Sequence, residues 1–257
     1  MVSHQENDLA PSTLAGRNWE TNAAFWIRII REKRDRYRTE LTDDAVLNAI
    51  GAAEGLRILD AGCGEGYMSR LLAHRGASVV GIDSCQGLIH AARDLNATEG
   101  LSIVYDVGDV RVLPLVDAIF DVVVCNHLIN DLPDPAIPFQ EFARVLKQGG
   151  RLVILMLHPC FYISRSTEQR SNGGLISSEY FRVRRIEQHF EVGGITSPTT
   201  VVAWIRSLES YCELLFDAGF SITGVQEPRP TEQLLQDPWW RVSFSQPRFL
   251  LMTAERR

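Results

Sequence analysis

Short apolar segments alternate with segments of helical spacing through the middle of the chain. Apolar runs of strand length lie at 57–61, 77–82, 101–105, 119–125 and 151–157, and helical spacing lies between them at 67–74, 86–96 and 135–146. Parallel strands are joined by crossover helices, and parallel sheets are covered on both faces. The alternation therefore predicts an α/β fold with right-handed βαβ units.

Two further apolar runs, at 220–225 and 248–253, predict a terminal pair of antiparallel strands at the sheet edge. The expected fold class is thus a doubly wound, Rossmann-like, mostly parallel seven-stranded sheet with helices on both faces. Residues 158–200 break the rhythm with mixed polarity and two glycine pairs, which predicts an insertion after the fifth strand. A helix should follow, with one apolar face made of Val202, Ile205, Leu208, Cys212 and Leu215.

The N-terminal part has a different pattern. Residues 1–16 are polar and predict a loose arm, helical spacing begins after the suitable N-cap Asn18, and a second helix is expected at 43–53. The first helix has an apolar face (Trp19, Ala23, Trp26, Ile27 and Ile30) and a basic one (Arg28, Arg31, Lys33, Arg34, Arg36 and Arg38). We expect residues 1–54 to form an arm and helical cover, and residues 55–257 to form the Rossmann-like domain with its insertion.

Composition narrows the classes of function. The 257 residues are 45% hydrophobic and carry a formal net charge of −6, which argues against a general nucleic-acid coat. No apolar run approaches the roughly 20 residues that span a membrane, and the N-terminal stretch lacks a signal-peptide pattern. The five cysteines are widely spaced without a C-x-x-C pair, so we expect neither a disulfide framework nor a metal site. These features predict a cytoplasmic protein.

The stretch 58–67 carries the strongest chemical signal in the chain. Its strand brings Asp60 to a carboxyl end, and Gly62, Gly64 and Gly66 then let the backbone turn tightly and approach a ligand. The helix that begins near Gly66 points free N–H groups at that ligand, which suits a carboxylate or a phosphate.

Two more acidic residues end the next strands of the predicted sheet. Asp83 stands where a carboxylate accepts hydrogen bonds from ribose hydroxyls, and Asp109 stands where one can take an adenine amino group. The carboxyl ends of parallel strands share one edge, so these side chains and Asp60 should face one crevice. The glycine order also differs from the G-x-G-x-x-G of dinucleotide sites, and Glu65 within it suits a ligand with an ammonium and a sulfonium.

Together these residues resemble the class I S-adenosylmethionine-dependent methyltransferases of the small-molecule type, over about Trp19 to Thr253. The resemblance implies a transferase with S-adenosyl-L-methionine as cofactor and S-adenosyl-L-homocysteine as product. The cofactor-binding residues that it implies are Arg38, Asp60, Gly62, Gly64, Gly66, Asp83, Ser84, Asp109, Val110 and Asn126. Among them, Arg38 follows Tyr37 at the end of the covering helix, where related enzymes meet the methionine carboxylate.

The segments after the fourth and fifth strands predict the acceptor site. His127 follows the fourth strand and His158 the fifth, so both should open onto the same crevice. We expect these two as catalytic residues, with His158 as general base. The predicted substrate pocket lies in the insertion and consists of Tyr162, Tyr180 and Phe181. It suits a small aromatic or apolar acceptor that is methylated on oxygen, carbon or nitrogen, while Asp131 is expected to cap the following helix.

Other functions stay open at this stage. An RNA methyltransferase would use the basic face of the first helix, although no aromatic residues are interleaved there. A non-catalytic module would bind S-adenosylmethionine without turnover, and a nicotinamide or flavin oxidoreductase is disfavoured by the glycine spacing. The expected partner is a small-molecule acceptor, with no membrane and no nucleic acid. The tryptophans of the first helix pack either on their own core or on a second subunit, and we expect a homodimer.

Overall fold

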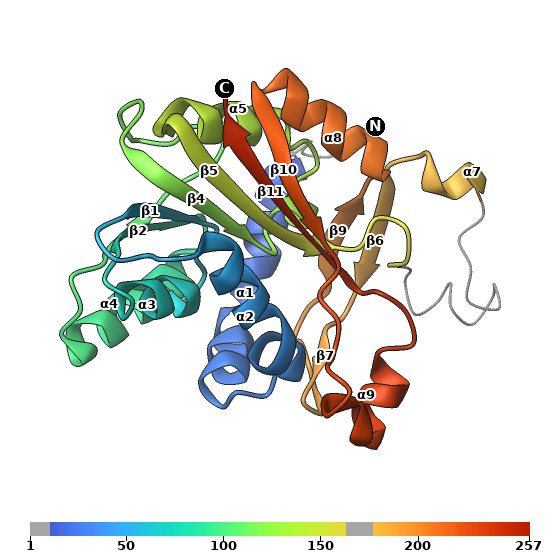
Figure 1. The fold of residues 1–257 in the computed structure, drawn as a ribbon. Helices are drawn as coiled ribbons and strands as arrows, with labels where there is room; N and C mark the ends of the chain where they lie inside the picture. Colours follow the sequence, from blue (N-terminus) through green and yellow to red (C-terminus); the bar gives the residue numbers. More distant parts are fainter. Residues whose placement is uncertain (1–10, 163–176) are drawn as a thin grey trace, which may run out of the picture.

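A seven-stranded sheet forms the centre of the protein (Figure 1), in the order β10-β11-β5-β4-β1-β2-β3. The computed structural model describes residues 11–162 and 177–257. The parallel strands are β1 (Arg57–Ala61), β2 (Ser78–Asp83), β3 (Val104–Val107), β4 (Phe120–Asn126) and β5 (Leu146–Leu157). At one edge, β11 (Phe249–Arg256) runs antiparallel to β5, and β10 (Phe220–Gln226) runs antiparallel to β11. The predicted fold class is confirmed, including the antiparallel terminal pair.

Helices cover both faces of the sheet. On one face lie α5 (Ala136–Val145) and α8 (Leu208–Asp217), and on the other lie α2 (Asp43–Ile50), α3 (Tyr67–Ala73) and α4 (Gln86–Glu99). Successive side chains of a strand point to opposite faces. Leu59 therefore joins the core under α5, its neighbour Ile58 joins the core under α3, and neither side chain is exposed.

The first helix, α1 (Pro11–Arg31), packs beside α4 and covers the carboxyl ends of the strands (Figure 1). It begins at Pro11, so the expected start after Asn18 is wrong: the polar residues before Asn18 continue the same helix. The side chain of Glu20 accepts hydrogen bonds from the Gly87 amide and the Cys85 thiol at the start of α4. A π-helical turn, η1 (Arg38–Thr42), then leads directly into α2.

The region after β5 forms a small antiparallel layer of its own. It contains α7 (Ser177–Tyr180), β6 (Arg184–Gln188), β7 (Glu191–Val192), β8 (Ile195–Thr196) and β9 (Val201–Ile205). Strand β6 pairs with β9, and β7 pairs with β8 around the second glycine pair. The expected helix over Val202 and Ile205 is wrong, because this β-branched run pairs with β6 and α8 begins only after Ser207, whose side chain caps it.

Three short elements complete the wall around the strand ends. The 3₁₀ turn η2 (Ile129–Asp131) follows β4, and η3 (Leu234–Gln236) and α9 (Pro238–Ser243) precede β11. Trp19 and Trp26 of α1 stack with ring centroids 5.8 Å apart, and both rings contact Phe190 beside β6. The tryptophans that suggested a dimer therefore pack within one chain, and the dimer itself stays a prediction. Among the described helices, none is long and apolar enough to span a bilayer.

The turn from β1 into α3 is closed by a tyrosine from β3. The backbone at Gly66 has φ of 81°, and its carbonyl accepts a hydrogen bond of 3.2 Å from the Tyr105 hydroxyl. A Cβ atom at Gly66 would lie 2.2 Å from that hydroxyl oxygen, whereas a Cβ atom at Gly64, where φ is 58°, would meet nothing within 4 Å.

These two glycines form a matched pair for a stability test. Gly64→Ala should cost about 1–2 kcal/mol of unfolding free energy, because only the left-handed backbone opposes it. Gly66→Ala should cost about 1–3 kcal/mol more, because it must also displace the buried Tyr105 ring. Urea unfolding followed by circular dichroism measures both values. Equal losses would show that the contact with Tyr105 does not restrict this position.

Candidate functional site

A cavity of about 820 Å³ opens at the carboxyl ends of the parallel strands. Its lining includes Asp60, Asp83, Asn126 and Leu157, which end β1, β2, β4 and β5, and Phe249, which starts β11. The remaining wall comes from α1, the layer of β6 and β9, and the segment around α9. The volume lies within the range of small-molecule sites, and the place is where open α/β sheets bind their ligands.

The structure brings most of the predicted cofactor-binding residues to this cavity. Those that line it are Arg38, Asp60, Gly62, Gly64, Asp83, Ser84, Asp109, Val110 and Asn126. Gly66 does not line the cavity, because its position is used for the contact with Tyr105. The three acidic residues at successive strand ends thus do face one crevice.

The Asp83 carboxylate joins the motif loop to the start of α4. One oxygen accepts a hydrogen bond of 2.9 Å from the Gly64 amide, and the other accepts one of 2.8 Å from the Cys85 amide. Burial raises the pKa of Asp83, against the lowering effect of these backbone donors. Each carboxylate oxygen has a second lone pair, so Asp83 can accept further hydrogen bonds from hydroxyl groups in the cavity.

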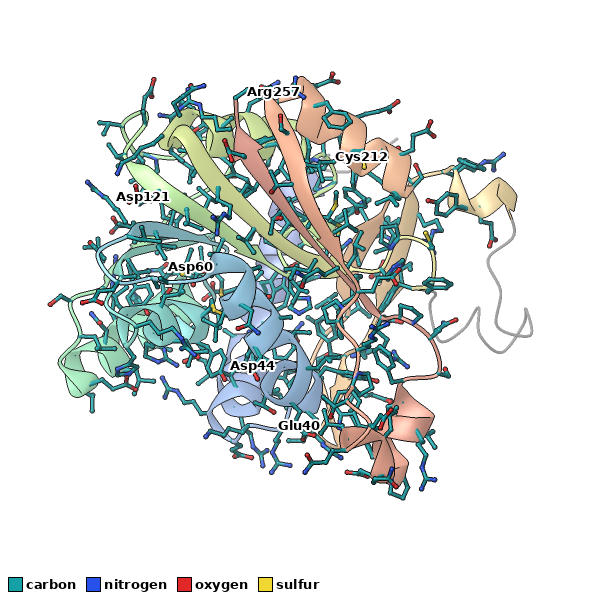
Figure 2. All side chains as sticks on the ribbon, viewed as in Figure 1. Glu40, Asp44, Asp60, Asp121, Cys212 and Arg257 are labelled. Atoms are coloured by element: carbon teal, nitrogen blue, oxygen red, sulfur yellow. The ribbon has the colours of Figure 1, made fainter. Side chains whose placement is uncertain are left out.

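Asp60 lies inside the molecule (Figure 2) and is only 1% exposed. Its carboxylate accepts a hydrogen bond of 2.6 Å from the Ser69 hydroxyl on α3. Burial raises the pKa of Asp60 to about 6, although the Ser69 hydrogen bond and the Arg38 charge act in the opposite direction. The group is therefore an acceptor of hydrogen bonds at neutral pH, held at the floor of the cavity.

Four buried polar atoms of the cavity lining lack a hydrogen-bond partner in the described part of the chain: Asn126 Oδ1, Arg38 Nε, Glu65 Oε2 and Gln188 Oε1. Arg38 has Asp35 3.9 Å away and lies over the Tyr67 ring at 5.7 Å. A buried polar atom without a partner is costly, so a ligand that satisfies these atoms would bind favourably. The lining offers the Arg38 cation for a carboxylate. It also offers carboxylate oxygens and the Asn126 amide oxygen, which can accept hydrogen bonds from an ammonium and from hydroxyls. This set fits the implied cofactor.

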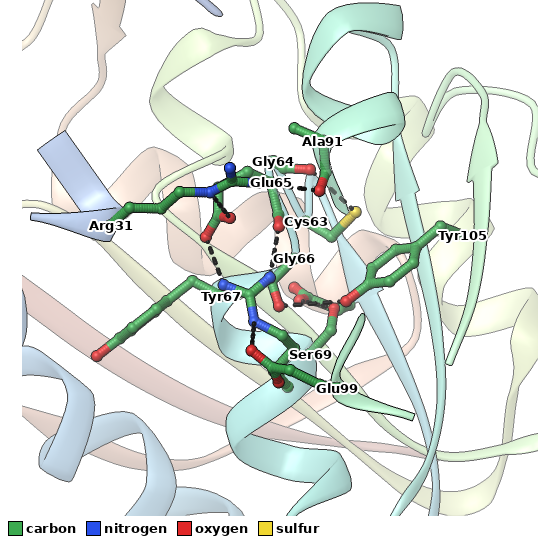
Figure 3. A network of polar contacts seen from close by, with 12 residues as sticks. Arg31, Cys63, Gly64, Glu65, Gly66, Tyr67, Ser69, Ala91, Glu99 and Tyr105 are labelled. Carbon is green, nitrogen blue, oxygen red and sulfur yellow. Dashed lines mark hydrogen bonds and ion pairs between the residues drawn. The ribbon is translucent and has the colours of Figure 1, made fainter. Parts of the chain in front are cut away.

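Glu65 serves a structural purpose that the sequence did not reveal. Its carboxylate is 2.8 Å from Arg70 of α3 and 3.8 Å from Arg31 of α1. Arg31 also donates to the carbonyl of Ala91 on α4, so this network joins three helices to the motif loop (Figure 3). Two arginines already pair with Glu65, but it lines the cavity and its Oε2 accepts no hydrogen bond from the described residues, so its interpretation as extra acidity for a cationic ligand stays a prediction.

Asp109 also has a cationic partner. The Arg111 guanidinium binds both oxygens of its carboxylate and holds the pKa of Asp109 below its usual value. Both residues line the cavity beside Val110. A ligand at this end would meet an ion pair rather than a free carboxylate.

The two predicted catalytic histidines lie in different surroundings. His127 lines the cavity with a backbone φ of 64°, and its ring packs edge-on against Phe249 at 5.3 Å. Burial lowers the pKa of His127 to about 3, and the Arg38 charge adds to this shift, so the imidazole is neutral at physiological pH.

His158 does not line the cavity, so the expectation that both histidines open onto one crevice is wrong. Its residue is 2% exposed, its Nδ1 accepts a hydrogen bond from the Cys160 amide, and its Nε2 lies 3.0 Å from Glu227. Both ring nitrogens are therefore occupied, which gives His158 a structural position between β5 and the segment after β10.

Of the three predicted pocket aromatics, only Tyr162 lines the cavity. The Tyr180 hydroxyl accepts a hydrogen bond of 3.0 Å from the Leu208 amide at the start of α8. Phe181 is 68% exposed. Neither Tyr180 nor Phe181 is a lining residue, because α7 lies against α8 and not against the strand ends.

Several lining residues were not identified from the sequence. They are Trp239, Arg248 and Phe249 from the C-terminal segment, Gln188 from β6, and Asp131 from η2. The expectation that Asp131 caps α5 is wrong, because the N-cap is Pro135 and the Ala136 amide donates to Asp134 instead. Burial raises the pKa of Asp131 well above its usual value. Only Asp131 carried a signal, since it follows the fourth strand closely.

The predicted basic face does not lie on one helix, because α1 ends at Arg31, and several of its arginines pair with nearby carboxylates. Arg28 and Arg34 pair with Glu32, and Arg36 pairs with Glu40 and Asp237. A phosphate-binding stripe needs cations that are available to phosphates. Since Glu32 is shared by two arginines and these pairs are partly exposed, the RNA alternative stays untested.

Comparison with known proteins places the chain among methyltransferase sequences. Residues 59–154 match a family described as a methyltransferase domain. A ubiquinone biosynthesis O-methyltransferase from Hahella chejuensis is 32% identical over 166 residues, 63% of this chain and 66% of that protein. One from Alkalilimnicola ehrlichii is 36% identical over 118 residues, 45% of this chain and 47% of that protein. The chain thus spans about half to two thirds of the length of these relatives.

Solved structures share the fold. An S-adenosylmethionine-dependent methyltransferase from Mesorhizobium loti has a TM-score of 0.64 at 24% identity, over 83% of this chain and 96% of that one. Geranyl diphosphate C-methyltransferase from Streptomyces coelicolor, in complex with Mg²⁺, geranyl diphosphate and S-adenosyl-L-homocysteine, has a TM-score of 0.59 at 17% identity, over 84% and 78%. At these identities the likeness concerns the fold alone.

The raised pKa of Asp60 predicts a pH-dependent stability. Between about pH 4 and pH 6 the folded protein keeps a proton that the unfolded chain has released, so the free energy of unfolding falls as the pH rises. Asp60→Asn should remove the contribution of this residue to the pH dependence, on the order of 2–3 kcal/mol, whereas Asp43, with a pKa of about 6, keeps its own. Urea unfolding of both proteins from pH 4 to pH 7 measures the difference.

Asp109→Asn is the control, because the pH dependence of stability that Asp109 contributes has the opposite sign. Because Arg111 lowers the pKa of Asp109, the stability that this pair contributes should be present above about pH 4 and lost as the pH falls below it. A difference between wild type and Asp60→Asn that does not vary with pH would contradict the burial of a titrating carboxyl at Asp60.

Proposed function

Because the chain belongs to the class I S-adenosylmethionine-dependent methyltransferase superfamily, we propose that it is an enzyme that methylates a hydroxyl oxygen of a small aromatic molecule. S-adenosyl-L-methionine is the cofactor that goes with this membership, and S-adenosyl-L-homocysteine is its product. The choice of an oxygen acceptor rests on the O-methyltransferase names of the curated relatives. The choice of an aromatic acceptor rests on the rings that line one end of the cavity.

The observation that carries the proposal is the extent of the cavity. It runs from the glycine loop after β1, across the ends of β4 and β5, to Phe249 at the start of β11. Neighbouring strands lie about 4.8 Å apart, so the three steps from β1 to β11 correspond to about 14 Å. A cavity of this extent accommodates a second ligand beside a cofactor that is bound at the glycine loop.

The unpartnered polar atoms support the orientation of the cofactor. Arg38 would bind its carboxylate, and Asn126 Oδ1 would accept a hydrogen bond from its ammonium. Asp83 would accept hydrogen bonds from the ribose hydroxyls with the lone pairs that Gly64 and Cys85 leave free. Val110 and the Asp109–Arg111 pair would contact the adenine ring.

The bound cofactor supplies a methyl group that is already activated on a sulfonium. The protein therefore needs to hold an acceptor oxygen in line with that methyl, and good alignment contributes up to about 7–11 kcal/mol in favourable models. His127 is the side chain that we assign to the acceptor hydroxyl, because it lines the cavity and its neutral ring can accept a hydrogen bond. Asp131, whose pKa burial raises, lies in the same lining.

Cofactor binding is tested at Asp83. Asp83→Asn keeps the size of the side chain but removes its charge, and it should weaken the binding of S-adenosyl-L-homocysteine at least tenfold in calorimetry. Asp106→Asn is the matched control, because Asp106 is an exposed carboxylate near the end of β3 that pairs with Arg93 outside the cavity. An unchanged dissociation constant in Asp83→Asn would reject the ribose assignment. If the wild-type protein does not bind the compound at all, the proposed function fails.

The catalytic assignment is tested by two histidine variants. Asparagine tolerates a positive φ, so His127→Asn should fold, retain the binding of S-adenosyl-L-homocysteine and lower turnover at least tenfold. His158→Asn should lower stability through the lost contact with Glu227 and leave the turnover of the folded protein within about threefold. Turnover is followed as release of S-adenosyl-L-homocysteine with hydroxylated aromatic acceptors. The reverse pattern would return the general-base role to His158.

A further inference from the structure

The cavity contains one basic side chain, Arg248, that forms no ion pair within the described residues. Every other arginine of the lining has a carboxylate partner: Arg34 has Glu32, Arg36 has Glu40 and Asp237, Arg38 has Asp35, and Arg111 has Asp109. An arginine side chain keeps its positive charge at all physiological pH values. A half-buried guanidinium without an anion is a candidate anion-binding group, since burying an unpaired charge is costly.

The position of Arg248 separates it from the glycine loop. It directly precedes β11, where its carbonyl accepts a hydrogen bond from the His158 amide, and the next residue, Phe249, pairs with Leu157. Strands β5 and β4 lie between β11 and β1, so about 14 Å of sheet separates this residue from the glycine loop. The cavity is thus acidic at the end of Asp60 and Asp83, and basic at the end of Arg248.

The guanidinium is held in a defined orientation. Its Nε donates a hydrogen bond of 2.6 Å to the Ser243 carbonyl, and its central carbon lies 5.3 Å from the centre of the Tyr37 ring. The Tyr37 hydroxyl donates to the same carbonyl at 2.7 Å, which fixes the ring beneath the cation. With Nε engaged, the two terminal nitrogens form the part of the fork that can bind an anion, and no acid of the described chain binds them.

Aromatic rings connect Arg248 to the proposed reaction site. Tyr37 lies 5.1 Å from Trp239 and 5.6 Å from Phe249, and Phe249 lies 5.3 Å from His127, all between ring centroids. These rings form a continuous wall from the cation to the histidine that we assign to the acceptor hydroxyl. A flat ring against this wall can direct a hydroxyl toward His127 and a second substituent toward Arg248.

We propose that Arg248 binds an anionic group on the methyl acceptor, so that the substrate class is a hydroxylated aromatic acid rather than a neutral phenol. This inference rests on the proposed function, because it names the acceptor of that same site. A carboxylate matches the planar geometry of the guanidinium fork best, since it can accept two parallel hydrogen bonds. Arg248 is then the residue that selects acids over neutral analogues of the same shape.

The test uses benzoate and its neutral analogue benzamide as probes of the site. Dissociation constants are measured by ligand-observed NMR titration, both with the protein saturated in S-adenosyl-L-homocysteine and without it. The wild-type protein should bind benzoate at least tenfold more tightly than benzamide. Arg248→Gln should abolish this preference, and Arg248→Lys should retain part of it because the charge is kept. Arg241→Gln, which removes an exposed charge from nearby α9, should leave it unchanged.

Three results would overturn the inference. Wild-type protein that fails to bind benzoate, or binds it no better than benzamide, has no anion site in the cavity. A preference that survives in Arg248→Gln assigns the anion to another residue. A tenfold loss of S-adenosyl-L-homocysteine binding in Arg248→Gln assigns the residue to the cofactor. The proposed methyltransferase function would then stand, but the acidic class of acceptor would not. If wild-type protein does not bind S-adenosyl-L-homocysteine, the proposed function fails. The preference for benzoate over benzamide, measured without S-adenosyl-L-homocysteine, still decides whether Arg248 binds an anion.

Discussion

The site depends on one constraint, the attachment of the glycine loop to the strand beside it. The amides of Gly62 and Cys63 both donate to the Ile82 carbonyl, and the Gly64 amide donates to Asp83 at the end of the same strand. These bonds continue the pairing of β1 with β2 beyond the last residue of β1. The loop is therefore a rigid floor, and the remaining elements have to be placed around it.

The first helix becomes part of the site because polar side chains connect it to three other segments. Glu20 binds the start of α4, Arg31 contacts Glu65 of the glycine loop, and Asn22 exchanges two hydrogen bonds with the backbone of Thr199 before β9. Asn22 is fully buried, so losing this exchange would leave unsatisfied groups in the interior. The cover, the floor and the insertion thus behave as one wall.

Charge is distributed unevenly along the cavity, and this explains how one opening can serve two ligands. The acidic residues near β1 and β2 lie at one end. Arg248, the lining arginine without an ion pair among the described residues, lies at the other, with neutral aromatic rings between them. Several other basic side chains of the N-terminal segment pair with carboxylates, among them Arg36 with Glu40 and Asp237. Glu40 lies near α9 (Figure 2). The net charge of the chain therefore does not indicate the charge of its ligands, whereas the pairing of individual charges in the cavity does.

Local pattern in the sequence was sufficient for the sheet, the glycine loop and the acidic strand ends. Strand β1 was predicted at its observed bounds, and Asp60, Asp83 and Asn126 reached the cavity, because each of them ends a strand whose direction follows from the alternation. The acceptor end could not be predicted in this way. Its wall joins Tyr37, His127 and Arg248, which are far apart in the chain, and no local period relates them.

His158 is a residue whose role was predicted wrongly for the same reason. Its place after the fifth strand predicted a catalytic residue, but the direction of its ring depends on Glu227, which follows a different strand. Sequence by itself determined the fold and the cofactor end of this protein, since both follow from strand periodicity and from backbone conformations that only glycine adopts easily. Only the tertiary structure decided which histidine faces the cavity and which arginine lacks a partner, because pairing between distant side chains depends on how the insertion and the C-terminal segment pack over the sheet.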